Sequence, residues 1–338
     1  MCARSGRITW NSYEPSRRGV VCILCKIPEK RKRPTGADCP ARNVPPLLKS
    51  GELIRNRYQV DDMIGGGGFG QIFKGMDTVD GDHLAIKIEP AEKDGRMIKV
   101  EYEMLSMLRG RSHIPMIRAS GSIRGCSFIA MTLLGTNLSD LRKQSSTQRF
   151  SHGTLYRIGQ QLTIALRHVH SCGFLHRDVK PSNACIGLPP NEKYIYLVDF
   201  GMVRKFIDIN GNIRPARDYA GFRGTMKFAS LAVHNRKETG TADDFIGLLY
   251  SMIEMGDGTL PWSKSRTAKQ IENLKATYSM ELLCRHQPPG MAEFAKHIDS
   301  LQWDESPDYE KIHDLFQSCM DDEIKEDTPY DWETRPKK

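Results

Sequence analysis

The sequence predicts an α+β fold, in which a small part rich in β-strands is followed by a larger, mainly helical part. Two observations support this prediction. Up to about residue 134, short apolar segments alternate with glycine-containing turns, which is typical of antiparallel strands. Beyond residue 135, apolar residues recur at helical spacing over longer segments. With 338 residues, of which 39% are hydrophobic, the chain can form one large domain or two modest ones.

The strand-rich part is expected to begin near Leu53. A turn at Asp80-Gly81 separates two of its strands. Residues 95–109 interrupt the strands with apolar residues at helical spacing, which predicts a helix there. The predicted strands are Tyr58–Ile64, Gln71–Met76, His83–Ile88, Met116–Ser122 and Ser127–Leu133.

The helical part is expected to contain one helix that is buried on most of its sides. Residues 243–255 are apolar nearly all round, which is typical of such a helix. Residues 154–171 carry their apolar residues on one face, and Gly173 ends this pattern as a C-cap glycine does. Shorter helices are expected at Asn137–Lys143 and near residues 265–276, 290–301 and 308–320. Ligand sites commonly lie in the crevice between two such parts.

The positive charge of the chain is concentrated in its first fifty residues. Residues 1–50 hold 11 Lys/Arg and 3 Asp/Glu, so their net charge of 11 − 3 = +8 equals that of the whole chain. The remaining residues therefore carry no net charge, which argues against a specific nucleic-acid partner inferred from the isoelectric point. We predict that residues 1–50 form a disordered tail and that residues 326–338 form a short C-terminal tail.

The basic run Lys30–Arg33 allows two interpretations, a nuclear-import or acidic-partner signal and a solubilising run of charge. No apolar run approaches the roughly 20 residues that span a bilayer, and no signal-peptide pattern is present. We therefore expect a cytoplasmic protein, with the nucleus as a second location and no membrane partner. The nine cysteines are scattered and odd in number, which indicates core residues and not a disulfide framework.

A glycine-rich motif, GGGGFG, occupies Gly65–Gly70 between two predicted strands. Glycines let backbone amides approach phosphate groups closely. A flexible hairpin is the alternative, because such a motif is weak evidence in isolation. The strand–turn–strand context argues against a dinucleotide-binding fold, in which a helix follows the glycines.

Lys87 lies on the third predicted strand, 17 residues after Gly70. An ammonium group there could hold the phosphates of ATP if a carboxylate from the next helix fixed its position. Glu101 is the expected partner, and Glu103 is its competitor, about 200° further around a helix. A surface lysine with solvated glutamates is the alternative interpretation.

Two further motifs supply the groups that phosphoryl transfer from ATP requires, and they read HRDVKPSN at 176–183 and DFG at 199–201. Asp178 is the candidate catalytic carboxylate that orients the acceptor hydroxyl and accepts its proton. Lys180 could neutralise charge on the γ-phosphate, and Asn183 and Asp199 are candidate magnesium ligands. Two further residues are expected to have structural roles. His176 is expected to brace the loop at 176–183, the catalytic loop, and Asp244 is expected to accept hydrogen bonds from the backbone of that loop.

Together these motifs resemble the casein kinase I group of protein kinases, and most of all its tau-tubulin kinase branch. The resemblance extends over residues 51–325, with an N-lobe at 51–134 and a C-lobe at 135–325. It implies the bilobal protein-kinase fold. Further stretches that carry it are GFLHRDVKPSN at 173–183, RPARDYAGFRGT at 214–225, Ala229-Ser230 in place of Ala-Pro-Glu, LPW at 260–262 and PDY at 307–309.

The resemblance implies a monomeric enzyme that uses ATP and Mg²⁺ to phosphorylate serine and threonine in acidic or pre-phosphorylated protein substrates. It also implies an adenine site with Met131 as gatekeeper, Thr132–Leu134 as hinge and Cys185 beneath the base. The full set of implied ATP-binding residues is Ile64, Gly65, Gly66, Gly67, Gly68, Phe69, Gly70, Ile72, Ala85, Lys87, Met131, Leu133, Leu134 and Cys185.

Basic residues cluster between residues 204 and 227, and we take Arg223 and Lys227 as the candidates for recognising a substrate anion. A solvated charged loop is the alternative. Lys227 stands where the group commonly has arginine, so the charge is kept but the bidentate fork is lost. Whether a primed phosphate is required therefore stays open.

Two other functions compete with that of an active kinase. One is a pseudokinase that serves as a scaffold, and the other is a cytoskeleton-binding module whose basic tail contacts acidic surfaces. The complete set of Lys87, Glu101, Asp178, Asn183 and Asp199 favours catalysis. Family resemblance does not define the physiological substrate, even if cytoskeletal proteins are among the candidates.

Overall fold

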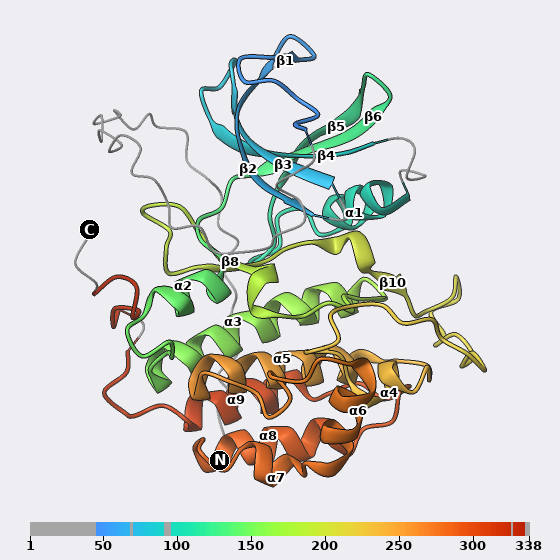
Figure 1. Ribbon diagram of the computed structural model, residues 1–338, viewed down its shortest axis with the longest axis vertical. Coiled ribbons are helices and arrows are strands. Elements are labelled where there is room, and N and C mark those ends of the chain that lie inside the picture. Colours follow the sequence, from blue (N-terminus) through green and yellow to red (C-terminus); the bar gives the residue numbers. More distant parts are fainter. Residues whose placement is uncertain (1–44, 68–69, 91–95, 326, 335–338) are drawn as a thin grey trace, which may run out of the picture. The chain divides into compact units, whose positions relative to one another are not determined.

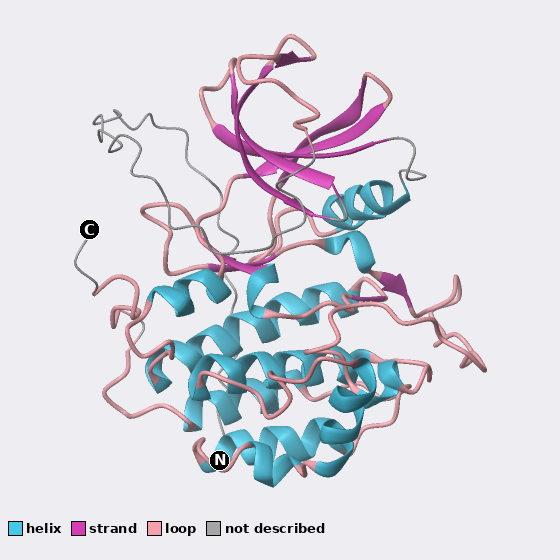
Figure 2. Cartoon of the chain, viewed as in Figure 1, coloured by secondary structure: helices cyan, strands magenta, loops and turns pink. Residues whose placement is uncertain are grey.

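The computed structural model describes residues 45–67, 70–90, 96–325 and 327–334 (Figure 1). The predictions for the basic run Lys30–Arg33, and for most of the tail at 1–50, lie outside these residues. Gly68 and Phe69 of the glycine motif also lie outside them. In the described part, a strand-rich region precedes a helical one, which confirms the predicted α+β arrangement (Figure 2).

A six-stranded antiparallel sheet forms the strand-rich region, with the order β1-β2-β3-β4-β6-β5. The five predicted strands are all present. The strand β1 was not predicted, because two residues are too short to show an alternation of apolar and polar side chains. The strands are β1 (Leu53–Ile54), β2 (Tyr58–Gly67), β3 (Gly70–Asp77), β4 (His83–Pro90), β5 (Ile117–Ile123) and β6 (Cys126–Thr132).

The helix α1 (Arg96–Met107) packs against β5 and β6 of this sheet and also contacts the turn η4 (Phe200–Met202). Its apolar residues Ile98, Met104 and Leu105 are buried, as their helical spacing indicates. They belong to the same core cluster as the helical region. Helix α1 thus connects the sheet to the segment that carries Asp199.

A second apolar cluster packs within the strand-rich region and includes Phe73, Phe128 and Leu48. Leu48 is only 1% exposed, and the Leu47 N–H donates to Gln71 Oε1 at 2.7 Å. Packed structure therefore begins before residue 51, where the sequence prediction placed the domain boundary. Two leucines in a polar, proline-containing stretch give no periodicity from which this packing could be predicted.

The helical region has α5 at its centre (Figure 1). All but a few residues at the C-terminal end of α5 are buried or nearly so, as predicted from its all-round apolar sequence. The four-residue helices α4 and α7 were not predicted, because they span one turn each. The helices are α2 (Leu138–Gln144), α3 (His152–Ser171), α4 (Leu231–His234), α5 (Thr241–Asp257), α6 (Ala268–Thr277), α7 (Met280–Leu283), α8 (Pro289–Asp299) and α9 (Tyr309–Ser318).

Short elements between α3 and α4 carry the residues of the catalytic motifs. Gly173 ends the preceding helix at φ +78°, and its N–H donates to the His170 carbonyl at 2.8 Å, as expected for a C-cap glycine. The short elements are β7 (Phe174–Leu175), η3 (Pro181–Asn183), β8 (Ala184–Ile186), β9 (Ile195–Leu197), η4 and β10 (Arg204–Lys205). The strands pair as β7 with β10 and β8 with β9.

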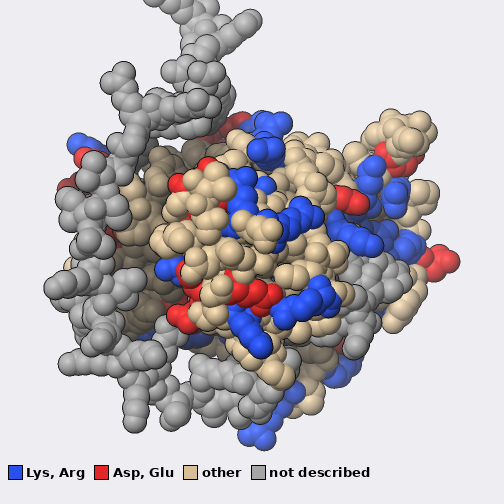
Figure 3. Space-filling view, turned by 90° about the horizontal axis from the view of Figure 1, so that it is seen from above, with Lys and Arg blue, Asp and Glu red and all other residues tan. Residues whose placement is uncertain are grey.

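Positive and negative side chains are mixed over the described surface that Figure 3 shows, seen from the strand-rich end. Residues 51–338 carry equal numbers of basic and acidic side chains, so this mixture follows from the sequence. No helix in the described ranges is long and apolar enough to span a bilayer.

Residues 327–334 pack against α3, although the sequence prediction treats residues 326–338 as a tail. Tyr330 is 3% exposed, lies over the Arg157 guanidinium at 3.9 Å and stacks on Trp332 with ring centroids 4.7 Å apart. Asp331 accepts hydrogen bonds from the N–H and the hydroxyl of Ser151, the N-cap residue of α3. This segment therefore forms part of the fold of the helical region.

We expect Tyr330→Ala to lower the free energy of unfolding by about 3 kcal/mol, because it removes a buried aromatic ring. Tyr330→Phe is the matched control, since it loses only the hydroxyl that receives a hydrogen bond from Gln161 at 2.7 Å, for a cost of about 1 kcal/mol. Urea unfolding measures both variants. Equal stabilities of the two variants would show that the ring contributes nothing.

Candidate active site

Three charged side chains from separate elements meet at Lys87. Lys87 lies on β4, and its Nζ is 2.6 Å from Glu101 Oε2 on α1 and 3.0 Å from Asp199 Oδ1. Glu101 is 1% exposed, whereas Glu103 points to solvent. The structure therefore places Glu101, and not its competitor, against the strand lysine.

The charges of this cluster depend on one another because the site is buried. Burial alone would lower the pKa of Lys87, but the carboxylates of Glu101 and Asp199 outweigh it and raise that pKa. Burial raises the pKa of Glu101, and the Lys87 ammonium opposes this rise. For Asp199, Lys87 outweighs burial and holds the carboxyl pKa below its usual value. A cationic lysine is thus fixed where anionic phosphates could bind.

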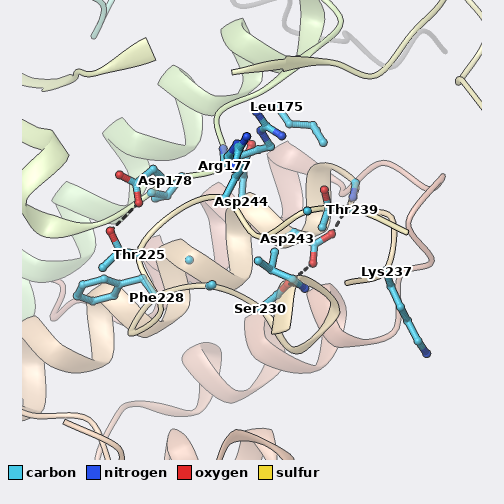
Figure 4. A pocket seen from close by; sticks show the side chains of 18 of the residues that line it. Leu175, Arg177, Asp178, Thr225, Phe228, Ser230, Lys237, Thr239, Asp243 and Asp244 are labelled. Carbon is cyan, nitrogen blue, oxygen red and sulfur yellow. Dashed lines mark hydrogen bonds between the residues drawn. The ribbon is translucent and has the colours of Figure 1, made fainter. Parts of the chain in front are cut away.

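Asp178 lies at the centre of a second cluster, and it is 3% exposed. Its Oδ2 accepts hydrogen bonds from Lys180 Nζ at 2.6 Å and from Asn183 Nδ2 at 3.1 Å. Its Oδ1 accepts a hydrogen bond from the Thr225 hydroxyl at 2.8 Å (Figure 4). The carboxylate is held from both oxygens, so it is oriented before any substrate binds.

The catalytic loop is held by Asp244, which is buried near the start of α5. Asp244 Oδ2 accepts hydrogen bonds from the His176 N–H at 2.7 Å and from His170 Nε2 at 2.9 Å, and Oδ1 accepts one from the Arg177 N–H at 2.7 Å. Burial would raise the pKa of Asp244, but the hydrogen bonds and charges of His170 and His176 together outweigh it and lower that pKa. The predicted structural role of Asp244 is therefore present in the geometry.

His176 braces the same loop, as predicted from the sequence. Its Nε2 lies 3.2 Å from the Val198 carbonyl, and its Nδ1 lies 3.3 Å from the Asp178 N–H. Its ring also packs edge-on against Phe200, with centroids 5.3 Å apart. His176 is fully buried, so it positions the loop and does not face a substrate.

The candidate metal ligands Asn183 and Asp199 supply oxygen atoms, the ligand type that magnesium prefers. Asn183 Nδ2 donates to the Asp178 side chain and backbone carbonyl, which leaves its Oδ1 to act as a ligand. Asp199 Oδ1 contacts Lys87, and the Asp199 side chain is 26% exposed, so the carboxylate can be reached. These residues fit the metal. When Mg-ATP is bound, the metal supplies charge neutralisation for the phosphate oxygens.

The residues implied for adenine binding are brought close by strand pairing. Ala85 on β4 lies opposite Met131 on β6, and Ile72 on β3 lies opposite Lys87. Residues 135 and 136 exchange backbone hydrogen bonds with Ile186, which places the strand of Cys185 beside the segment that follows Leu133 and Leu134. Burial raises the pKa of the Cys185 thiol to about 12, so this thiol stays protonated.

The described glycines of the motif lie at the ends of two paired strands, with Gly65, Gly66 and Gly67 in β2 and Gly70 in β3. Ile64 precedes them and is 53% exposed. Gly70 has a φ of +130°, and a Cβ atom at this position would lie 2.4 Å from the Ile88 carbonyl oxygen. Glycine is required there by both conformation and space.

The structure does not bring the two candidate anion-binding residues together. Arg223 lines a cavity of about 40 Å³ beside Asp178, Arg177 and Thr225 (Figure 4). Lys227 lies outside this cavity and forms an ion pair with Glu254 at 2.6 Å. Glu254 also accepts a hydrogen bond from the buried Arg142 at 3.2 Å. Lys227 is thus engaged in an ion pair within the protein, although Glu254 shares its charge between two cations.

Sequence analysis missed the role of Thr225. Its hydroxyl donates to Asp178 and accepts a hydrogen bond from Lys180 Nζ at 2.8 Å, so it connects two candidate catalytic groups across 45 residues or more of sequence. Its place in the RGT sequence at 223–225 was the only available signal, and it does not specify this contact.

The geometry defines the class of protein. A lysine held by two carboxylates, an oriented acid with a neighbouring lysine, and two oxygen ligands together are the groups that transfer a phosphoryl group from a nucleoside triphosphate. Residues 58–326 match the family model of the protein kinase domain, and the chain belongs to the protein kinase family. Its fold is the bilobal α+β fold of that family.

Curated relatives agree with this membership. A Dictyostelium discoideum protein whose name places it with serine/threonine-protein kinases is 37% identical over 288 residues, covering 85% of this chain and 58% of the relative. A Caenorhabditis elegans protein named for casein kinase I is 37% identical over 295 residues, covering 84% of this chain and 85% of the relative. A second C. elegans protein, named as a serine/threonine-protein kinase, is 35% identical over 299 residues, 86% of each chain. The chain is thus similar to proteins named as serine/threonine-protein kinases and as casein kinase I.

We expect Asp178→Asn to reduce the rate of phosphoryl transfer at least about a hundredfold, because it removes the group that accepts the hydroxyl proton. ATP binding should be unchanged, since the nucleotide contacts Lys87 and the glycine strands instead. Radiolabelled γ-phosphate transfer to casein measures the rate, and calorimetry measures ATP binding.

Asp304→Asn is the control, because Asp304 is an exposed acid following α8. Transfer by Asp178→Asn at the wild-type rate would contradict the assignment of Asp178 as the catalytic carboxylate.

Proposed function

We propose that the protein is a serine/threonine kinase of the casein kinase I group, most like its tau-tubulin kinase branch, that phosphorylates hydroxyl groups next to acidic or already phosphorylated residues. The observation that carries this proposal is the excess of positive charge beside Asp178. Arg177, Arg217, Arg223 and Lys237 all contribute to the lining of one cavity there. The same lining contains three acids, Asp178, Asp243 and Asp244, so basic side chains exceed acidic ones by one and an acidic substrate would balance this excess.

The electrostatics at Arg177 support this proposal. Burial, then repulsion from Arg204, lowers the pKa of Arg177 to about 10; the Asp244 carboxylate opposes this shift, and Arg223 and Arg217 add to it. Its Nε donates to the Met202 carbonyl, which is neutral and cannot offset the repulsion. An anion bound near Arg177 and Arg223 would relieve this repulsion, so binding it should be favourable.

Arg223 is the better candidate for contact with a substrate anion. Arg217 and Arg204 are both paired with Glu238, at 2.7 and 3.3 Å. By contrast, the Arg223 guanidinium in the described structure donates to the backbone carbonyl of the preceding residue, Phe222, at 3.1 Å. Its charge is therefore available to a ligand, whereas Lys227 would first have to leave Glu254.

The remaining features of the proposal rest on the sequence. We propose a monomeric kinase that acts on protein substrates, cytoskeletal proteins among them, in the cytoplasm and in the nucleus if the run Lys30–Arg33 directs import. ATP and Mg²⁺ are its cofactors. The contact of Lys87 with both Glu101 and Asp199 supports an active enzyme over an inert scaffold.

We expect Arg223→Glu to raise the KM for an acidic serine peptide roughly tenfold, which corresponds to about 1.4 kcal/mol of lost binding. The KM for a neutral peptide of the same length should change much less, because it contributes no charge to this site. Steady-state phosphorylation of the two peptides measures the difference.

Arg285→Glu, an exposed arginine near α7, is the charge-matched control. Lys227→Met tests the second candidate, and a small effect is expected because Lys227 lies outside the cavity and is held by Glu254. Equal KM changes for both peptides with Arg223→Glu would remove the anion-recognition proposal while leaving kinase activity in place.

A further inference from the structure

A lysine of α6 reaches the end of the activation segment, the stretch between Gly201 and Ser230. Lys275 is 3% exposed, although lysine side chains commonly reach solvent. Its Nζ donates to the Met226 carbonyl at 2.8 Å and also to the Ala229 carbonyl. The two carbonyls flank Lys227 and Phe228, so one ammonium group holds both ends of a short bend.

The surroundings of this ammonium group contain rings and carbonyls in place of a carboxylate. It lies over the faces of Tyr250 and Trp262, at 4.9 and 5.1 Å from the ring centroids. His234 Nε2 lies 3.3 Å away. Among the described residues no acidic group forms an ion pair with Lys275, and burial lowers its pKa to about 7. Burying a lysine nitrogen without an acidic partner opposes folding. A contribution to the free energy of unfolding is therefore a poor explanation for the burial of Lys275.

The segment that Lys275 holds lies next to the catalytic carboxylate. Thr225, whose hydroxyl contacts Asp178, immediately precedes Met226. Phe228 and Ala229 line the cavity that Asp178 also lines. The Phe228 and Ala229 N–H groups donate back to the Thr225 carbonyl at 2.9 and 3.0 Å. A shift of this bend would therefore move Thr225 and the wall against which a substrate lies.

Trp262 fixes the same bend from the other side. Its Nε1 donates to the Lys227 carbonyl at 2.8 Å, and its ring packs edge-on against Tyr250 at 4.8 Å. The carbonyls of Met226, Lys227 and Ala229 are thus all bound by side chains from outside the segment. These contacts recognise the backbone, so they define where the bend lies without depending on its side chains.

We propose that Lys275 is a positioning residue for the phosphoryl-acceptor site: its buried Nζ, donating to two carbonyls, holds residues 226–229 in the conformation that places the substrate hydroxyl against Asp178. Lys275 does not touch the nucleotide residues Lys87, Glu101 or Asp199. Its loss should therefore impair the use of a protein substrate while leaving nucleotide binding intact. A residue with a purely structural role would impair both together.

The test compares Lys275→Met, which keeps the length of the side chain without its charge, with Lys269→Met. Lys269 is a lysine of the same helix whose side chain is 72% exposed, and it pairs with Glu272. Three quantities are measured: kcat/KM for a serine peptide that the wild type phosphorylates, the KM for ATP, and the slow hydrolysis of ATP in the absence of peptide. Hydrogen exchange of the backbone amides at 226–230 is followed in parallel.

For Lys275→Met we expect kcat/KM for the peptide to fall at least tenfold, with the KM for ATP and peptide-free hydrolysis unchanged and with faster exchange at 226–230. Lys269→Met should behave as wild type, and Lys275→Arg should recover part of the loss because it keeps a cation. An equal fall in peptide transfer and ATP hydrolysis, or no fall in peptide transfer, would overturn the proposal. If Lys275→Met does not fold, Lys275→Gln is judged by the same criteria.

Discussion

The contact of Lys87 with two carboxylates is the constraint on which the rest of the site depends. Glu101 lies 14 residues after Lys87 and Asp199 lies 112 residues after it, so the contact joins β4, α1 and the segment before η4. Removing these charges from water is costly unless they pair with good geometry. Helix α1 must therefore pack against the sheet and against η4 together. The apolar residues Met104 and Leu105 supply the burial that holds it there.

The acceptor side of the site depends on a different buried charge. Asp244 holds the backbone of the catalytic loop against α5 through two hydrogen bonds, and a third joins it to the His170 side chain of α3, so Asp178 is tied to the core. Thr225 then connects Asp178 to the end of the activation segment, which Lys275 and Trp262 hold by its backbone carbonyls. The two sides meet at His176, which packs against Phe200 beside Asp199, but Lys275 and Trp262 contact only the acceptor side.

The features that sequence predicted are those that follow from local spacing. Alternating apolar residues indicated the strands around Lys87, and the position of Glu101 on the next predicted helix made it the expected partner, with Glu103 as the competitor. The position of Asp244 at the start of a largely apolar helix indicated its structural role. Contacts between distant segments left no such pattern. Lys227 and Glu254 pair across 27 residues, and Lys275 looks like any solvent-facing lysine in its own helix. Tyr330 likewise lies in a polar stretch whose packing partner, Arg157, is more than 170 residues away in the chain.

The most direct test of the central constraint is a crystal structure of the protein with a non-hydrolysable ATP analogue and Mn²⁺, whose anomalous scattering locates the metal in place of Mg²⁺. We expect Lys87 to stay in contact with Glu101 while its ammonium group also contacts phosphate oxygens. We also expect the anomalous peaks of Mn²⁺ to lie next to the side-chain oxygens of Asn183 and Asp199. A Glu101 side chain turned to solvent in the nucleotide complex, or manganese bound away from Asn183 and Asp199, would contradict these expectations.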